Sequence, residues 1–237
     1  MKKWTTRVTL TLAVLLIIMY ALFQLSKSRT YQLFGDLTDR VDTNQKVIAL
    51  TLDDGPTEQT DEVLKVLKEA DVKATFFVTG AELQQHPEEG KKIVQAGHEL
   101  GNHSYSHTRM VLKSPSFIKN EIEKTDQLIR DAGYQEEILF RPPNGKKLIL
   151  LPYYLSQHNR KTIMWDIEPD SYADIGSNSD KIVQHVKENV KPGSIILLHV
   201  MYKNREESLK SIKGVVESLR KQGYTFKTVS ELLAEKK

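Results

Sequence analysis

The sequence of 237 residues contains no cysteine. This absence excludes disulfide bonds, zinc sites built from thiolates and catalysis by a cysteine nucleophile. Exported proteins from cells that make little use of disulfides have this composition, and so do many cytosolic proteins. The lack of cysteine therefore limits the chemistry of the protein and leaves its compartment open.

The chain also lacks the excess of positive charge that favours binding to nucleic acid, although its formal net charge is +3. Five of the 34 basic residues lie within residues 1–30, which contain no acidic residue. The rest of the chain holds 29 basic and 31 acidic residues, a net charge of −2. A mildly acidic body is unsuited to a polyanion, and we expect no nucleic-acid partner.

Charged residues are absent from residues 8–25, an apolar run that follows three basic residues. As a helix this run is about 27 Å long, which is enough to cross the hydrocarbon layer of a membrane. A cleavable signal peptide begins in the same way, but bulky Tyr20 and Phe23 stand where a cleavage site needs small residues. We therefore predict a retained signal anchor over residues 1–25, with a cytoplasmic N-terminus and the rest of the chain outside. Cleavage and a buried core helix are the alternatives.

The remainder is predicted to consist of a polar stem over residues 26–45 and one folded domain over residues 46–237. In the domain, short apolar runs alternate with longer amphipathic stretches, which indicates alternating strands and helices. Strands are expected at residues 47–52, 74–79, 99–102, 138–141, 162–167, 194–199 and 224–228. Helices are expected at residues 60–70, 87–96, 116–132, 147–157, 179–190, 206–222 and 230–236. This α/β alternation favours a parallel sheet, either open or closed into a barrel of about seven strands.

Polar residues gather directly after five of the predicted strands. They are Asp53-Asp54-Gly55-Pro56, His103-Ser-Tyr-Ser-His107, Arg141-Pro-Pro-Asn-Gly145, Trp165-Asp-Ile-Glu-Pro-Asp170 and His199. Each of them alone has a structural explanation, such as a turn, a strand cap or a hydrogen-bonded core histidine. The carboxyl ends of parallel strands in a barrel open on one face, however, so segments far apart in the sequence meet there. Together they predict a functional site.

His103 and His107 have the spacing of a metal site. Residues four apart on one helical turn project from the same face, so both imidazoles reach a single ion. With one carboxylate they make a three-ligand site for Zn²⁺ or a related divalent ion and leave a position open for water. Such an ion lowers the pKa of its water toward ~7 and polarises a carbonyl. A second carboxylate as base and a separate histidine as acid would complete a site that hydrolyses an amide or an ester.

The order and spacing of these motifs resemble a known family. The motifs are Thr51-Leu-Asp-Asp-Gly-Pro56, His103-x-x-x-His107, Arg141-x-Pro-x-Gly145 and Leu197-x-His199. They are similar to those of the NodB-homology polysaccharide deacetylases, carbohydrate esterase family 4, and the similarity runs from about Lys46 to Ser230. The resemblance implies a distorted (β/α)7 barrel and a metal-dependent reaction that removes an N-acetyl group from an amino sugar.

The resemblance also implies a cofactor and a division of roles. The cofactor is one divalent ion, Zn²⁺ in the first place, with Co²⁺, Mn²⁺ and Ni²⁺ as alternatives. Asp53 matches the catalytic base, Arg141 matches the residue that orients this base, and His199 matches the general acid. The residues that match the metal ligands are Asp54, His103 and His107.

Two further residues match the part of the family's site that contacts the acetyl group. The backbone N–H of Asn144 matches a donor to the oxyanion, and Leu197 matches an apolar wall for the methyl group. The aromatic residue of the family's third motif is replaced by Asn144 itself, and Val200 replaces the Asp that often follows the acid histidine. The backbone role of Asn144 is independent of its side chain.

The fourth motif departs most from the family's pattern, in which an Asp that tunes the acid histidine is followed by a Trp of the acetate pocket. An ungapped match places Ser171 and Tyr172 at these two positions, whereas a shift by one residue places Asp170 at the Asp position. We prefer Asp170 as the partner of His199 and take Tyr172 as the aromatic residue of the pocket. Ser171 and Glu168 are the alternatives at the Asp position.

The sequence therefore predicts an outward-facing deacetylase, tethered to the cell membrane by a single span, that acts on an N-acetylated glycan. Peptidoglycan and chitin-like polymers are the candidate substrates, and secretion follows if the span is cleaved. The first alternative is a non-catalytic glycan-binding or envelope-assembly protein on the same fold, because the fourth motif is altered. The second is a hydrolase of another C–N amide bond. The sequence specifies no oligomeric state.

Overall fold

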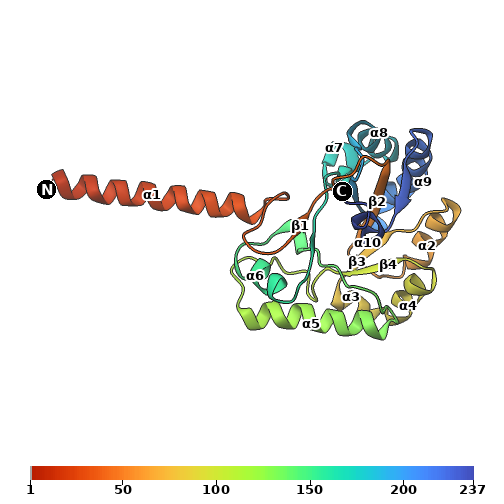
Figure 1. The fold of residues 1–237 in the computed structure, drawn as a ribbon, viewed down its shortest axis with the longest axis horizontal. Coiled ribbons are helices and arrows are strands. Elements are labelled where there is room, and N and C mark those ends of the chain that lie inside the picture. Colours follow the sequence, from red (N-terminus) through yellow and green to blue (C-terminus); the bar gives the residue numbers. More distant parts are fainter. Residues whose placement is uncertain (1) are drawn as a thin grey trace.

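Strand β2 (Val47–Asp53) is buried along its whole length and lies in the middle of the main sheet in the computed structural model, which describes residues 2–237 (Figure 1). It pairs in parallel with β3 (Thr75–Val78) on one side and with β6 (Ile195–His199) on the other. Beyond β3 the sheet continues with β4 (Glu99–Asn102). The first residues of β2 also pair with β7 (Thr225–Lys227).

Single backbone bridges close the sheet into a ring. Phe140 pairs in parallel with β4 and with β5 (Thr162–Ile163), and Ile167 pairs in parallel with Ile196 of β6. The strands therefore return to β6, which pairs with β2. This closure confirms the predicted distorted (β/α)7 barrel and rules out the alternative of an open sheet. The barrel is distorted where strands are reduced to single bridges.

Two of the predicted strands are shorter than expected. The strand expected at residues 138–141 is reduced to the bridge at Phe140, because two prolines follow and proline has no N–H to donate to a ladder. The strand expected at residues 162–167 is interrupted. There the carboxylate of Asp166 accepts the N–H of Ile195 at 2.9 Å, in place of a backbone carbonyl.

Helices cover the outside of the barrel, and all seven predicted helices are present. The helices of the domain are α2 (Thr60–Glu69), α3 (Gly80–Gln85), α4 (Pro87–Gln95), α5 (Pro115–Asp131), α6 (Leu150–Gln157), α7 (Ala173–Gly176), α8 (Ser179–Asn189), α9 (Glu206–Lys221) and α10 (Val229–Leu233). Helices α8 and α9 lie side by side in Figure 1. The sequence did not predict α3 and α7, because helices of six and four residues are too short to show a period.

The alternation of side chains along β2 determines what faces the interior of the barrel. Ile48, Leu50 and Leu52 belong to a cluster with the outer helices, whereas Ala49 belongs to the cluster inside the barrel. Successive side chains of a strand point to opposite faces. Asp53 lies on the same face of the strand as Ala49, so its carboxylate points into the barrel at the end where the strand stops.

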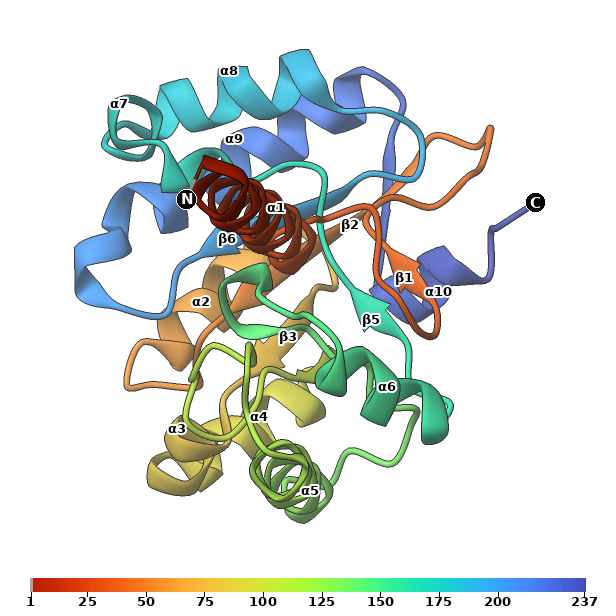
Figure 2. The ribbon, with the colours of Figure 1, turned by 90° about the vertical axis from the view of Figure 1, so that its left-hand side faces the viewer.

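Helix α1 (Lys2–Ser26) projects away from the domain (Figures 1 and 2). Its apolar side chains are largely exposed. Within the described chain it is the one helix that is long and apolar enough to cross a membrane, over Thr6–Ser26. A signal sequence near an N-terminus has the same length and composition. The exposed side chains of α1 exclude a buried core helix, whereas an anchor and a signal sequence both match them.

The segment predicted as a stem, residues 26–45, is packed against the barrel. Within it, β1 (Leu37–Thr38) pairs in parallel with β5, and Val41 is only 1% exposed. The fold therefore begins earlier than the expected boundary near Lys46. The polar composition of the segment concealed this, because a two-residue strand and one buried valine leave no periodic pattern.

The packing of this segment can be tested at Gly193. Its φ is +80°, and a Cβ added there would lie 1.9 Å from the carbonyl oxygen of Val41. Gly133, with φ of +95° and no atom within 4 Å, is a matched control for the backbone conformation alone. We expect Gly133→Ala to lower the free energy of unfolding by about 1–2 kcal/mol. Gly193→Ala should cost clearly more, because Val41 must also move. Equal losses in thermal unfolding of the full chain would contradict the close packing.

Candidate active site

The carboxyl ends of the strands bring the predicted polar residues together around one cavity of about 340 Å³. Asp53 at the end of β2 and His199 at the end of β6 are partners in the register of the two strands. The predicted residues that line the cavity are Asp53, Asp54, His103, His107, Asn144, Leu197 and His199. Residues outside the preferred set also line it, namely Arg29, Trp165, Glu168, Ser171 and Arg205.

Three side chains offer donor atoms to one point. Oδ1 of Asp54 lies 3.3 Å from Nε2 of His107 and 3.8 Å from Nε2 of His103. The three donor atoms all lie within 4.8 Å of one another. Oδ1 of Asp54 is buried and has no hydrogen-bond partner among the described residues. A buried carboxylate oxygen without a partner is costly, so this donor set fits a divalent cation.

The two histidines reach this point from a loop, and the helical turn predicted for them is wrong. Residues 103–107 follow β4 without forming a helix, and the two imidazole rings are 4.9 Å apart. The chain turns sharply here because Ser104 and His107 adopt positive φ angles of 64° and 54°. Asp54 has a φ of 70° as well. Strained conformations of this kind gather at functional sites, where they aim side chains.

A hydrogen bond sets the protonation of His103. Its Nδ1 lies 2.8 Å from the backbone carbonyl oxygen of Arg141, so Nδ1 carries the proton and donates it to that oxygen. Burial lowers the pKa of His103 to about 3, and the imidazole is therefore neutral. The lone pair of Nε2 then faces Asp54 and His107, as a metal ligand requires.

Arg141 holds Asp53 in a fixed orientation. Its buried guanidinium donates from Nη1 to Oδ1 of Asp53 at 2.5 Å and to the hydroxyl of Thr51 at 2.8 Å. Nη2 donates to the carbonyl oxygen of Met164 at 3.1 Å. Burial raises the pKa of Asp53, and the charge of Arg141 opposes this rise. The second oxygen of Asp53, Oδ2, lies 3.5 Å from Nε2 of His103 and so faces the donor set.

Asp170 is the carboxylate that contacts His199. Its Oδ2 accepts the backbone N–H of His199 at 2.6 Å, and its Oδ1 lies 3.3 Å from the ring nitrogen Nδ1. Burial lowers the pKa of His199, but the hydrogen bond and charge of Asp170 outweigh it and raise the pKa to about 9. The two alternatives contact each other instead, since the hydroxyl of Ser171 donates to Glu168 at 2.7 Å. The shifted reading of the fourth motif matches this geometry.

The structure does not bring Tyr172 to the cavity. The turn at Pro169–Ser171 carries it outward, where it is 53% exposed and its ring lies 5.7 Å from His185. Trp165 lines the cavity instead, with its indole N–H donating to Glu168 at 2.7 Å. Trp165 belongs to the polar segment that follows the fifth predicted strand, but the family's spacing favours Tyr172.

The remaining predicted residues, Asn144 and Leu197, also line the cavity. Asn144 sits in a tight turn with a φ of 53°, and its side-chain oxygen accepts a hydrogen bond from Arg109 at 3.0 Å. Leu197 is buried on β6. Arg29, from the segment after α1, also reaches the cavity, where it donates to Glu168 at 2.5 Å. No sequence signal marked Arg29, because its position depends on how residues 26–45 fold.

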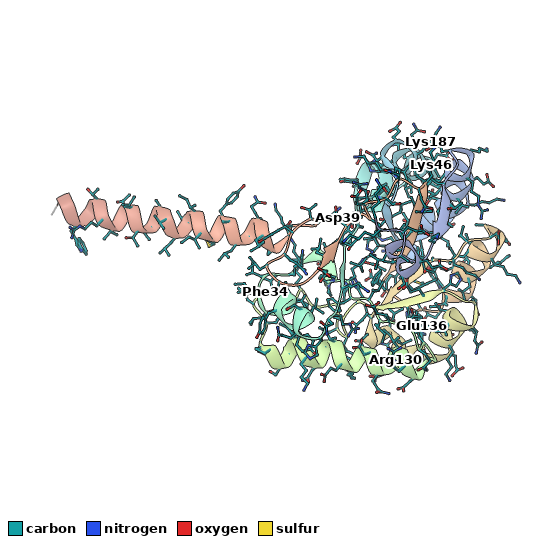
Figure 3. All side chains as sticks on the ribbon, in the orientation of Figure 1. Phe34, Asp39, Lys46, Arg130, Glu136 and Lys187 are labelled. Carbon is teal, nitrogen blue, oxygen red and sulfur yellow. The ribbon has the colours of Figure 1, made fainter. Side chains whose placement is uncertain are left out.

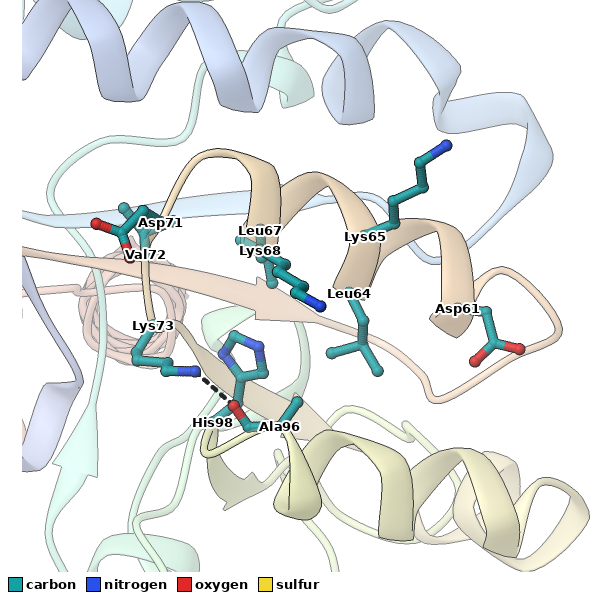
Figure 4. Close-up of a pocket in the computed structure, with 10 residues that line it drawn as sticks. All are labelled: Asp61, Leu64, Lys65, Leu67, Lys68, Asp71, Val72, Lys73, Ala96 and His98. Carbon is teal, nitrogen blue, oxygen red and sulfur yellow. Dashed lines mark hydrogen bonds between the residues drawn. The ribbon is translucent and has the colours of Figure 1, made fainter.

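A larger hollow of about 610 Å³ lies between α2 and the start of β4 (Figure 4). Its one histidine, His98, accepts the backbone N–H of Ala74 at 3.1 Å, and burial lowers its pKa to about 4. Lys73 at the same edge donates to the carbonyl oxygen of Ala96 at 2.6 Å. These polar groups are engaged in holding the fold, so the smaller cavity is the candidate active site.

Comparisons with known proteins agree with this site. A profile of the family described as polysaccharide deacetylase matches residues 40–163. A peptidoglycan-N-acetylglucosamine deacetylase of Bacillus cereus is 34% identical over 203 residues, which cover 85% of this chain and 95% of that protein. A peptidoglycan-N-acetylmuramic acid deacetylase of Bacillus subtilis is 32% identical over 203 residues, 82% of this chain and 74% of that protein.

A solved structure has the same fold. It is that of BA3943 from Bacillus anthracis, described as a pseudoenzyme of carbohydrate esterase family 4, with a TM-score of 0.75 and 30% identity. The match covers 84% of this chain and 69% of that one. The chain belongs to the polysaccharide deacetylase family, and the resemblance seen in the sequence is confirmed. Membership alone does not establish turnover, since the family includes a pseudoenzyme.

The donor set can be tested by removing its histidines one at a time. We expect about one divalent ion per chain, and we expect His103→Ala or His107→Ala to abolish this stoichiometric binding, because two donors hold such an ion weakly. His185→Ala, which lies outside the cavity, is the control and should keep the ion. Elemental mass spectrometry of the purified full chain measures the content. Full occupancy in both ligand variants would contradict the site.

Proposed function

We propose that the protein is a metal-dependent deacetylase that hydrolyses the N-acetyl group of amino sugars in a cell-envelope glycan. The observation that carries this proposal is the unpartnered, buried Oδ1 of Asp54 beside two histidine nitrogens, with the oriented carboxylate of Asp53 next to it. Relatives named as peptidoglycan deacetylases support peptidoglycan as the substrate. N-acetylglucosamine and N-acetylmuramic acid units are both candidates.

The residues divide the chemistry of amide hydrolysis between them. Asp54, His103 and His107 would hold the ion, which supplies a Lewis acid and a water of lowered pKa when bound. Asp53 accepts a proton from the attacking water through Oδ2, since Arg141 occupies Oδ1. The proton lost by water thus resides on Asp53 while the oxygen bonds to the acetyl carbon.

The groups opposite Asp53 complete the reaction. The backbone N–H of Asn144 stabilises the oxyanion, and Leu197 packs against the acetyl methyl group. His199 donates a proton to the amide nitrogen as its bond to carbon breaks, so that acetate and a free amino sugar leave. The pKa of His199, raised to about 9, keeps this proton in place at neutral pH.

Helix α1 supports a location at the outer face of the cell membrane. Basic residues precede its apolar span, which favours a cytoplasmic N-terminus and an external domain. Retention as an anchor is the proposal, with removal as a signal sequence as the alternative. An external domain also suits a cell-wall glycan as substrate.

A non-catalytic glycan-binding protein is the second candidate, favoured by the altered fourth motif and by the pseudoenzyme among the similar structures. Against it stands the complete set of contacts at Asp53 and His199. Hydrolysis of an N-acetylglucosamine oligosaccharide by the purified full chain, lost with a chelator and regained with added metal, separates the two. Binding of the oligosaccharide without acetate release would favour the second candidate.

The adjacent carboxylates should respond differently to removal of their charge. Asp53→Asn keeps the shape but cannot accept a proton, so kcat should fall by at least about 10²-fold while the metal stays bound. Asp54→Asn should weaken metal binding, with partial rescue of activity by excess metal. Kinetics and metal content measured on the same samples distinguish these outcomes. Loss of metal in Asp53→Asn and retention in Asp54→Asn would mean that the roles are exchanged.

The pH profile should report on Asp170. The acid must be protonated, so kcat/KM falls as the pH rises through the pKa of His199. Without the carboxylate the raised pKa drops, and Asp170→Asn should therefore move the alkaline limb to lower pH. Ser171→Ala is the control, because its hydroxyl contacts Glu168 and leaves His199 untouched. A shift in the Ser171 variant, with none in the Asp170 variant, would favour the ungapped reading.

A further inference from the structure

The end of α1 is joined to the domain without a free linker. The carbonyl oxygen of Ser26, its last residue, accepts the backbone N–H of Lys147 at 3.0 Å. The ammonium group of Lys147 donates to the carbonyl oxygen of Ser28, and this side chain is only 1% exposed. These hydrogen bonds join the base of α1 to the domain, from which the helix projects (Figure 2).

The cavity begins within a few residues of this point. Arg29 lies three residues beyond the end of α1, and an extended chain covers at most about 11 Å over that distance. Its guanidinium donates to Glu168 and lies 4.7 Å from the ring centre of Trp165, both of which line the cavity. The mouth of the candidate active site is thus close to the boundary of the apolar span.

An exposed apolar surface lies beside the same point. We use the name apolar patch for Tyr31, Leu33, Phe34, Ile149, Leu150 and Tyr153, which are 40–56% exposed. The rings of Phe34 and Tyr153 are in edge contact at 5.5 Å and join the two halves of the patch. Figure 3 places Phe34 on the side of the domain from which α1 extends. Contiguous exposed apolar groups mark an interaction surface.

Positive charge accompanies the patch. The ammonium groups of Lys27 and Lys146 lie 4.9 and 5.6 Å from the ring centre of Phe23, in the last turns of α1. Burial lowers the pKa of Lys146, and the neighbouring charges of Arg109 and Lys27 lower it further. Three basic groups therefore gather where the apolar span ends. Basic groups next to aromatic and aliphatic ones are suited to the headgroup region of an anionic bilayer.

We propose that the domain docks on the outer surface of the membrane through the apolar patch and these basic residues. The occupant is the lipid surface itself, because the patch begins five residues after the apolar helix ends and basic groups lie beside that end. What docking means for the substrate rests on the proposed function. The active site would then open at the bilayer and act on N-acetylated glycan that is still at the membrane, the product of a glycosyl transfer to a lipid-linked or nascent chain.

The absence of cysteine makes docking measurable on the full chain. Three variants each carry a single cysteine, in place of Leu33, Ile149 or Glu136. Each cysteine is labelled with an environment-sensitive fluorophore, and the labelled chain is inserted into vesicles of phosphatidylglycerol and phosphatidylcholine. Glu136 is exposed and lies farther from α1 (Figure 3), so it is the matched control. Labels at Leu33 and Ile149 should be quenched by lipids with a spin label near the headgroup at least about twofold more than the label at Glu136.

Two results would overturn docking on lipid. Equal quenching at all three positions would show that the patch does not meet the bilayer. Protection of the Leu33 and Ile149 labels from aqueous iodide without lipid quenching, and only at high protein density, would show a second copy of the chain on the patch instead.

A variant tests the consequence for the substrate. Leu33→Ser, Ile149→Ser and Leu150→Ser together should leave kcat/KM on a soluble acetylated oligosaccharide unchanged, which also shows that the fold is intact. Hydrolysis of the same oligosaccharide attached to a lipid in the vesicles should fall at least about tenfold, because α1 still tethers the domain but the patch no longer holds the cavity toward the bilayer. If the triple variant and the unaltered chain hydrolyse the lipid-attached oligosaccharide at the same rate, docking has no role in the reaction. Absence of activity in the unaltered chain would refute the proposed function, while the quenching still decides the docking.

Discussion

Buried Arg141 is the residue whose hydrogen bonds link the groups of the site to the strand ends of the barrel. Its side chain fixes Asp53 and Thr51 of β2, while its backbone carbonyl fixes the imidazole of His103. Its N–H donates to the carbonyl oxygen of Asn102 at the end of β4. A buried cation needs a counter-charge, so loss of the carboxylate of Asp53 would leave the guanidinium without compensation. The carboxylate of Asp53, the imidazole of His103 and the ends of β2 and β4 are therefore held by one residue.

The burial of β2 on both faces explains why so few residues are needed to build the site. Outer helices cover one face and the interior cluster covers the other, so the strand cannot shift in register without exposing apolar groups. The register with β6 then fixes Asp53 opposite His199. The cluster of charges is thus positioned by an apolar strand that carries no charge before its last residue.

The sequence was sufficient to predict which residues gather at the strand ends and insufficient to predict those that reach the cavity by irregular paths. The motifs of Asp54, His103 and His107 follow buried strands, whose pattern is strong, and the structure gathers them as expected. The loop that carries the two histidines was interpreted as helical, because a spacing of four does not distinguish a helix from a turn with positive φ. A shift of one residue across a short loop also leaves no pattern in the sequence, which is why Tyr172 was predicted to lie in the cavity.

The early start of the fold was missed for a related reason. Two residues of β1, one buried valine and the single side chain of Arg29 give no period that a sequence could show. Their positions depend on tertiary contacts, above all with β5 and Glu168. Short elements that pair at the edge of an existing barrel are determined by that barrel rather than by their own composition.

Glu168 accepts hydrogen bonds from Arg29, Trp165 and Ser171, so the wall of the cavity and the segment after α1 meet in one carboxylate. A substitution of one of these three donors therefore changes the hydrogen bonding of the carboxylate that the other two share. Replacing Ser171 by an aspartate would restore the family's spacing, but it would set a second negative charge against Glu168 and remove a hydrogen bond that Glu168 now accepts. Substitutions in such a network are not additive. A substitution at Ser171 would therefore also change how the segment after α1 is held against the wall of the cavity.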